Sequence, residues 1–278
     1  MKKVAVIGIV GNSVFLPVEN FHVGGETVEA QSVHFELGGK GFNQAVAAAR
    51  YGVETSFLAA VGTDSYDSVK AYLEKENIQA TLAKKRENTA FAAIITDKKG
   101  NNRVTVYQGA QLSENDVELF ENAIKNADIL LLNNEVTETV NVKAIEIAKR
   151  YGVKVILNPA PARKTCEYIL QNVDLFTPNE HETLGLENKQ NVVITLGGAG
   201  CLIKSTNTKI PPIRVNAVDT TGAGDTFNGI LAACLSENAD MEQAVQTAII
   251  GSGLSVTRKY AVSSIPTKKE IGAYIKKA

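Results

Sequence analysis

The 278-residue sequence contains no tryptophan, three histidines and three cysteines, and it has almost no excess charge of either sign. Its 29 Lys and Arg residues are balanced by 30 Asp and Glu residues and are scattered, whereas a nucleic-acid partner requires a concentrated basic face. The longest basic cluster, Lys84-Lys85-Arg86, precedes Glu87, and we interpret it as a solvated turn. We therefore expect no nucleic-acid partner.

Cysteine and histidine are too few and too dispersed to indicate a zinc site. Cys166, Cys201 and Cys234 form no C-x-x-C pair, and an odd number of widely spaced cysteines does not indicate a disulfide framework. This usage predicts a reduced, cytoplasmic protein.

Long apolar runs are also missing. No stretch reaches the roughly 18 apolar residues of a transmembrane helix, so we expect no membrane partner. Met1-Lys2-Lys3 followed by Val4 to Val10 resembles the start of a secretory signal, but this run is one strand long and lacks a small-residue cleavage pattern. We interpret it as the first buried strand of a globular protein, in keeping with a composition that is 44% hydrophobic and 21% charged.

Short apolar runs alternate with helical patterns along the chain. The predicted strands are Val4–Val10, Ser56–Val61, Ile129–Leu132, Val153–Leu157, Leu175–Phe176 and Val192–Leu196. The predicted helices are Asn43–Tyr51, Ser65–Glu76, Asn115–Asn126, Thr137–Tyr151 and Met241–Val256. Such alternation predicts a mostly parallel central sheet covered by helices.

Two regions break this rhythm. Val28 to Leu37 alternates every two residues, and Phe91 to Tyr107 is predicted to be a hairpin that turns at Asp97-Lys98-Lys99-Gly100. We expect these regions, about 12–37 and 88–109, to form a small β lid over a ligand site. No repeat or linker interrupts the chain, which predicts one domain over residues 1–278.

The segment DTTGAGDTFNG, Asp219 to Gly229, places an acid where a glycine-rich turn becomes a helix. Apolar spacing predicts that this helix begins at about Asp225. In the preceding Gly222-Ala223-Gly224, main-chain N–H groups can face an anion beside the positive end of the helix dipole. Asp225 is then suited to deprotonate a hydroxyl that attacks phosphorus. The alternative is a simple turn with Asp225 as helix N-cap.

A second glycine segment, Gly38 to Gln44, also leads into a helix. Its paired glycines bring the backbone close to a neighbour, and Lys40 and Asn43 offer polar groups to a hydroxylated ligand. The spacing does not match a Walker phosphate-binding loop, because no Ser or Thr follows the lysine. The alternative is a glycine turn with a solvated lysine.

Two further segments follow predicted strands. Thr195 to Gly200, TLGGAG, suits a nucleotide lying over the carboxyl end of a sheet, and the alternative is a plain hairpin. In Asn179-Glu180-His181-Glu182, a carboxylate can hold Mg²⁺ through water, and the alternative is a set of acidic residues that open a helix. We expect His181 to lie on the surface.

Together these segments resemble the ribokinase-like (PfkB) carbohydrate kinases over nearly the whole chain. The matching motifs are GGKGFNQAV near residue 40, NPAPA at 158–162, TPNEHE at 177–182, TLGGAG at 195–200, AVDTTGAGDTFNG at 217–229 and VTRK at 256–259. The resemblance implies a three-layer α/β/α domain with a β lid that often serves as a dimer contact. It further implies an ATP-dependent kinase that phosphorylates a hydroxymethyl group of a sugar.

The resemblance also implies roles for individual residues. Asp225 looks like the general base, with Gly222, Ala223 and Gly224 as the anion hole. The sugar-contacting positions that match are Gly39, Lys40, Asn43 and Glu135, with Gly11 and Ser13 at two further places. The nucleotide positions that match are Asn179, Thr195, Gly197, Gly198, Gly200 and Gly224. Glu182 resembles a residue that organises Mg²⁺, and Asp219 and Thr221 resemble part of a monovalent-cation site that suits K⁺.

Departures from the family pattern leave the acceptor open. Ribokinases carry Asn and Asp where this chain has Gly11 and Ser13, and losing a charged hydrogen bond weakens binding roughly tenfold to a hundredfold. Asn12 is a candidate replacement. Tyr260 stands where the family has a tightly turned glycine, which weakens the prediction of the cation site. The alternatives are a nucleoside kinase of the same family, a kinase of a non-sugar alcohol, and a sugar or nucleotide sensor without turnover.

Overall fold

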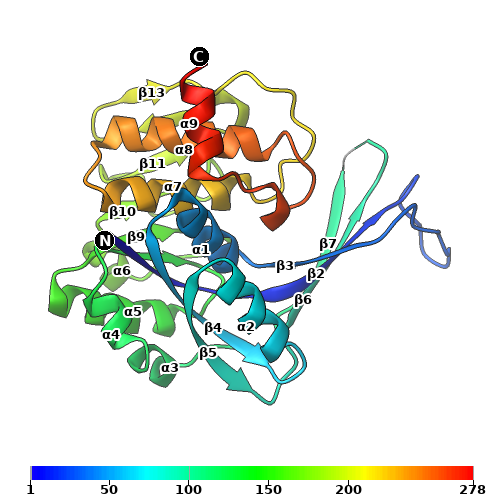
Figure 1. Ribbon diagram of the computed structural model, residues 1–278, viewed down its shortest axis with the longest axis horizontal. Coiled ribbons are helices and arrows are strands. Elements are labelled where there is room, and N and C mark those ends of the chain that lie inside the picture. Colours follow the sequence, from blue (N-terminus) through cyan, green and yellow to red (C-terminus); the bar gives the residue numbers. More distant parts are fainter. Residues whose placement is uncertain (1, 100, 278) are drawn as a thin grey trace.

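The computed structural model describes residues 2–99 and 101–277 (Figure 1). Its main sheet has six strands in the order β10-β9-β8-β1-β4-β5, and every neighbouring pair is parallel. The strand bounds are β1 (Lys3–Ile7), β4 (Glu54–Gly62), β5 (Ile78–Lys85), β8 (Ile129–Asn133), β9 (Lys154–Asn158) and β10 (Leu175–Phe176). The predicted parallel sheet is confirmed.

A small antiparallel sheet continues beyond β10. It consists of β11 (Val193–Thr195), β12 (Cys201–Ile203) and β13 (Thr208–Ile210). Isolated bridges from Phe176 to Val192 and from Asn179 to Thr195 hold it beside the end of the main sheet. The segment Thr195 to Gly200 therefore does join two antiparallel strands, as the hairpin interpretation expects, and lies next to the segment that follows β10.

Helices cover both faces of the main sheet. One face carries α1 (Lys40–Tyr51), α2 (Tyr66–Lys75), α7 (Ala223–Ser236), α8 (Met241–Ser255) and α9 (Lys268–Ile275), and the other carries α3 (Glu114–Glu118), α4 (Glu121–Lys125), α5 (Glu138–Tyr151) and α6 (Glu167–Asn172). Side chains of β1 alternate between the two faces of the sheet and pack against both helix layers. Val4 and Val6 lie in one hydrophobic core, and Ala5 and Ile7 lie in the other. The three-layer α/β/α fold is confirmed.

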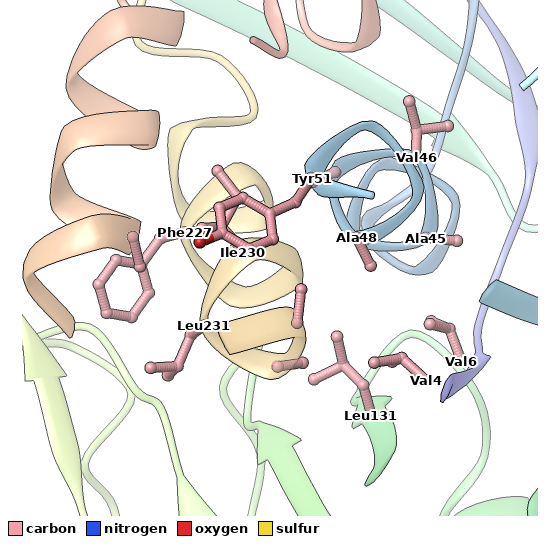
Figure 2. Close-up of a cluster of buried hydrophobic side chains, with 14 of the residues drawn as sticks. Val4, Val6, Ala45, Val46, Ala48, Tyr51, Leu131, Phe227, Ile230 and Leu231 are labelled. Atoms are coloured by element: carbon pink, nitrogen blue, oxygen red, sulfur yellow. The ribbon is translucent and has the colours of Figure 1, made fainter. Parts of the chain in front are cut away.

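Helices α1 and α7 pack side by side over the middle of the sheet (Figure 2). Ala45 and Ala48 of α1 and Ile230 of α7 are fully buried there above Val4 and Leu131. Their contact is close, because a Cβ added at Gly229 would lie 2.3 Å from the main-chain oxygen of Gln44. This packing places the first turns of both helices next to each other at the carboxyl edge of the sheet.

A second sheet projects from that edge (Figure 1). We call it the lid sheet; its strands are ordered β3 (His34–Gly38), β2 (Gly11–Pro17), β6 (Ala90–Thr96) and β7 (Asn102–Tyr107). Thr89, just before β6, ties it to the main sheet: its Oγ1 donates to Asp64 Oδ1 at 2.8 Å and accepts from Gly62 N at 3.0 Å. The predicted hairpin of Phe91 to Tyr107 is thus part of a sheet beside the main one.

Several sequence predictions are wrong in detail. Lys84 and Lys85 lie in β5, a strand missing from the prediction, and Lys85 is paired with Asp116 at 2.7 Å instead of standing in a solvated turn. An edge strand tolerates such lysines because one side faces water. Val28 to Leu37 is a strand only from His34, and the helix predicted over 115–126 is interrupted at Leu119 and Phe120, which separate α3 from α4. Strand β13 and helices α6 and α9 are also additions to the prediction.

Within residues 2–99 and 101–277, no helix combines the length and apolar composition that crossing a bilayer requires. Cys166, Cys201 and Cys234 are all free thiols.

Candidate active site

Asp225 lies in the first turn of α7 and is only 7% exposed. The helix begins at Ala223 with Gly222 as its N-cap residue, so the alternative of Asp225 as a helix cap is wrong. The carboxylate instead faces the start of α1, where Oδ2 accepts from Asn43 Nδ2 at 2.9 Å and Oδ1 accepts from Gln44 Nε2 at 3.4 Å. The close packing of α1 and α7 therefore decides where this acid points.

The charges of three carboxylates act on the Lys40 ammonium. The charge of Asp225 does most to raise the pKa of Lys40; Glu135 and Glu182 raise it further, while burial opposes them. Burial raises the pKa of Asp225, against the opposing effects of Lys40, Asn43 and Gln44. Because the desolvated carboxylate holds protons more tightly than a free one, Asp225 has the character of a stronger base.

Glu135 is the second acid of the site, and it is partly buried. Burial, with the nearby charge of Asp225, raises the pKa of Glu135 to about 7, although Lys40 opposes the rise. Its Oε2 accepts a hydrogen bond of 2.7 Å from the main-chain N–H of Lys40. Glu135 thus connects the end of β8 to the start of α1.

A cavity of about 330 Å³ lies between the lid sheet and these residues, and we call it the acceptor cavity. The lining residues are Ile9, Gly11, Asn12, Ser13, Gly38, Gly39, Lys40, Ala90, Phe91, Ala92, Val106, Gln108, Asn134, Glu135 and Pro161. Five residues predicted to contact the sugar, namely Gly11, Ser13, Gly39, Lys40 and Glu135, line this one cavity. Asn43 and Asp225 are not in its wall and adjoin it through Lys40.

Asn12 lines the cavity, but its amide carries no charge that could replace the missing carboxylate. Neighbouring residues of a strand point to opposite faces, so Asn12 faces away from Ser13, and its Nδ2 donates to Ser65 Oγ at 2.8 Å. The lid side of the cavity therefore presents the Ser13 hydroxyl where ribokinases have an acid.

The glycine turn before α7 offers main-chain donors. Among the described residues, the N–H groups of Gly222 and Gly224 have no acceptor, whereas that of Ala223 donates to Thr220 O at 3.2 Å. Gly222 has a φ of 74°, and a Cβ added at Gly224 would meet nothing within 4 Å, so the space in front of the turn is open. Free N–H groups at a helix N-terminus suit a phosphate oxygen.

The predicted nucleotide and magnesium segments lie together. Thr195 bridges to Asn179, and the turn at Gly197 and Gly198 is open, since a Cβ at either would meet nothing within 4 Å. Gly200 is different, because a Cβ added there would lie 2.1 Å from Ile210 O. The fold therefore requires glycine at this position.

Residues 179–182 form a turn, so the helix-opening interpretation is wrong. Glu182 Oε2 accepts from Asn179 N at 3.0 Å, and its charge acts on Lys40. His181 has a side chain that is 84% exposed, and its predicted surface position is confirmed.

Asp219 has hydrogen-bonding partners on both oxygens. Oδ1 accepts from the N–H and the hydroxyl of Thr221 at 2.9 and 2.7 Å, and Oδ2 accepts from Tyr260 N at 2.8 Å. Tyr260 has a φ of 72°, the left-handed conformation that glycine adopts without strain.

Some residues of the site were not predicted from the sequence. Gln44 and Asn158 form a buried amide pair beneath Asp225, with Gln44 Nε2 at 3.3 Å from Asn158 Oδ1. Both residues lie inside motifs on which the family resemblance rests. Their polar side chains within these motifs could have marked them as site candidates. Gln108 and Asn134 line the acceptor cavity, and only the tertiary fold brings them there.

An acid, a lysine and free main-chain donors at the carboxyl edge of a parallel sheet are groups that a phosphotransferase with an alcohol acceptor uses. The model of the pfkB family of carbohydrate kinases matches residues 1–268. Ribokinase of Haemophilus influenzae is 35% identical and aligns over 100% of this chain and 99% of its own. This chain belongs to the pfkB family of carbohydrate kinases.

Two solved structures are similar over their whole length. Ribokinase from Thermotoga maritima gives a TM-score of 0.89 at 33% identity and covers 99% of this chain and 100% of its own. Ribokinase from Arabidopsis thaliana, complexed with ribose and ATP, gives a TM-score of 0.84 at 25% identity and covers 99% of this chain and 98% of its own.

Proposed function

We propose that the protein transfers the γ-phosphoryl group of ATP to a hydroxymethyl group of a sugar, with Asp225 as general base. The observation that carries this proposal is the position of Asp225, a desolvated acid beside the free N–H groups of Gly222 and Gly224 and next to the lysine that lines the acceptor cavity. These groups are the parts that phosphoryl transfer needs: a base for the attacking oxygen and donors for the charge on the phosphoryl group.

In the proposed mechanism, Glu135 and Lys40 hold the acceptor in the cavity and orient its hydroxymethyl group toward Asp225. Asp225 takes the hydroxyl proton as the oxygen attacks the γ-phosphorus, the bond from that phosphorus to the bridging oxygen breaks, and ADP leaves. Asn43 and Gln44 fix the carboxylate through the hydrogen bonds at 2.9 and 3.4 Å, so the base does not reorganise during the step. The free N–H groups of the glycine turn stabilise the charge on the transferring group.

Magnesium fits the residues at Glu182. One oxygen of this carboxylate accepts from Asn179 N, while the other takes no hydrogen bond from the described residues and can hold a metal-bound water. We propose that Asn179, Thr195, Gly197 and Gly198 hold the nucleotide. Bound Mg²⁺ would neutralise charge on the nucleotide phosphates.

A monovalent cation fits less well. Both oxygens of Asp219 already accept hydrogen bonds, and Tyr260 stands where the family pattern has glycine. We therefore derive no step through K⁺ and assign Asp219 and Thr221 the role of holding the turn before the anion hole.

A nucleoside is the second candidate acceptor. Ile9, Ala92, Val106 and Pro161 give the cavity apolar lining, and Lys40 and Glu135 give it charged groups. A nucleoside, with an apolar base and a hydroxylated ribose, matches this mixed lining.

The test is ADP production with Mg-ATP and a panel of pentoses, hexoses and nucleosides. We expect turnover on at least one member, and Asp225→Asn to lower kcat by about a hundredfold or more with little change in KM, since a general base typically contributes 10²–10⁴. An Asp225→Asn enzyme of near-normal rate would remove the proposed base. No turnover and no thermal shift on any member would favour the non-catalytic sensor.

We also propose that residues 1–278 act as one kinase unit, that two copies dimerise through the lid sheet, and that the protein works in the cytoplasm. Phe35 and Tyr107 support the dimer: strand register places them on the lid face opposite Ser13, and they are 69% and 52% exposed. The free thiols support a reducing compartment.

A further inference from the structure

Lid strand β3 is bound to a loop that lies far away in sequence, residues 260–263. The side chain of Glu36 is 5% exposed, and its carboxylate accepts from Ala261 N at 2.7 Å, from Ser263 N at 3.2 Å and from Ser263 Oγ at 2.7 Å. A buried carboxylate that takes main-chain donors fixes their position, since leaving those donors unpaired is costly.

Aromatic rings reinforce the same contact. His34, also on β3, stacks on Tyr260 with ring centroids 3.6 Å apart and planes inclined by 8°. Phe15 of β2 packs edge-on against Tyr260 at 5.2 Å. Two strands of the lid sheet therefore hold the ring of a residue whose backbone adopts a left-handed conformation.

The loop is connected in turn to the anion hole. The N–H of Tyr260 donates to Asp219, and the other oxygen of Asp219 accepts from Thr221, the residue before Gly222. Gly222 also packs on Ala261, since a Cβ added there would lie 3.2 Å from Ala261 Cβ. A continuous set of contacts therefore runs from the lid sheet to the donors that face the phosphoryl group.

We propose that Glu36 and Tyr260 are positioning residues that couple the lid sheet to the anion hole. The proposal rests on the function proposed above for the turn at 222–224. An acceptor that holds the lid sheet over the cavity thereby fixes the 260–263 loop and the glycine turn, and a phosphate bound at the turn stabilises the closed lid in return, because linkage is reciprocal.

The first experiment needs no substrate. Amide hydrogen exchange is measured residue by residue in the ligand-free protein for the wild type and Glu36→Ala. We expect exchange at least about tenfold faster at Ala261 and Ser263, which bond Glu36 directly, and also at Tyr260 and Thr221, which bond only Asp219. Faster exchange confined to Ala261 and Ser263 would overturn the coupling.

Two further variants separate the ring from the backbone. Tyr260→Gly removes the ring and also relieves the left-handed strain, so a loosened loop in this variant cannot be attributed to backbone strain. Tyr260→Phe keeps the stacked ring and serves as its matched control. We expect faster exchange at Thr221 in Tyr260→Gly and wild-type exchange in Tyr260→Phe; equal exchange in both would contradict a role for the ring.

The second experiment measures kinetics with the best acceptor of the panel. Glu36→Ala is expected to lower kcat about tenfold while changing KM for ATP by less than about twofold. The control is Glu29→Ala, at an exposed residue between β2 and β3, and it is expected to change neither. If Glu36 contributed only to folding stability, Glu36→Ala would lower the melting temperature but would leave kcat unchanged in assays well below that temperature. Normal kcat in Glu36→Ala would refute the proposal. If no acceptor is turned over, the proposed function fails, and the exchange data still decide the coupling.

Discussion

At the residue scale, Gly224 and Gly229 lie on the same helix but meet different surroundings. A methyl group at Gly224 stands in the open space before the anion hole, while one at Gly229 would lie 2.3 Å from the Gln44 oxygen. We expect Gly224→Ala to keep or raise stability by up to about 1 kcal/mol and to lower kcat at least about tenfold. Gly229→Ala should lose about 1–3 kcal/mol of stability. Melting curves and kcat for both variants check this, and an active Gly224→Ala enzyme would count against phosphate binding at the turn.

Glu135 provides a second prediction at this scale. Its pKa of about 7 in the fold, against 4.5 for a free carboxyl, means that its contribution to stability is fully present below pH 4.5 and is lost as pH rises through about 7. Asp225 and Lys40 are the charged groups that face it. Glu135→Gln, which stays neutral, should be more stable than the wild type at about pH 8, by on the order of 2–3 kcal/mol, and equal to it near pH 4.

Urea unfolding at both pH values checks the Glu135 prediction. Asp225 is present in both proteins. To first order, its titration therefore contributes equally to the two free energies of unfolding and cancels in their difference. A stability difference that is the same at both pH values would show that the carboxylate is not strained by its burial. The same variant should bind the acceptor more weakly, so that stability and activity change in opposite directions.

The residues of the site could be predicted from sequence where the signal is local. Asp225 and its glycine turn are contiguous, and the helical spacing after them places the acid at a helix start. The direction of the carboxylate was not predictable, because Asn43 and Gln44 bind it from 182 and 181 residues away. The contact of Glu36 with Ser263 spans 227 residues and has no local pattern.

At the element scale, the lid sheet depends on the tie at Thr89. Burial would raise the pKa of Asp64, but hydrogen bonds from Thr89 and Ser65 keep it below the usual range. Thr89→Val keeps the shape and removes both side-chain hydrogen bonds, to Asp64 and to Gly62. We expect a loss of about 1–3 kcal/mol in stability and a several-fold higher acceptor KM with nearly unchanged kcat.

Steady-state kinetics and urea unfolding test the Thr89 prediction. Thr105→Val, on the exposed strand β7, changes the same group without a main-sheet contact and is the matched control. A lower kcat with an unchanged acceptor KM would mean that the tie acts on the chemical step instead of on the lid.

Elements were predictable from sequence where periodicity is strong. Buried strands such as β8 and β9 and long helices such as α5 and α8 lie within a few residues of their predicted bounds. The edge strand β5 was missed because its partly exposed residues carry lysines that look like a turn. The single helix predicted over 115–126 is instead two short helices, α3 and α4, since apolar spacing alone does not show the break at Leu119 and Phe120.

At the scale of the whole molecule, the order of the motifs predicts the layered fold, since alternating strands and helices leave few topologies. The position of the lid sheet relative to the main sheet could not be predicted from the sequence. Residues 11–17 follow β1 and enter the lid sheet, where they pair in parallel with β6, whose residues lie 79 positions later. Only the assembled structure shows that this arrangement encloses the acceptor cavity.

The outer face of the lid sheet supports the last prediction, a dimer that Phe35 stabilises. Burying an aromatic side chain of this kind contributes roughly 1.5–3 kcal/mol, so Phe35→Glu should weaken dimerisation about tenfold to a hundredfold. Leu119, 74% exposed at the junction of α3 and α4, is an equally apolar control far from the lid sheet. Light scattering over a range of protein concentrations should show dissociation of Phe35→Glu and an intact Leu119→Glu dimer. A monomeric wild type, or equal behaviour of the two variants, would contradict the lid interface.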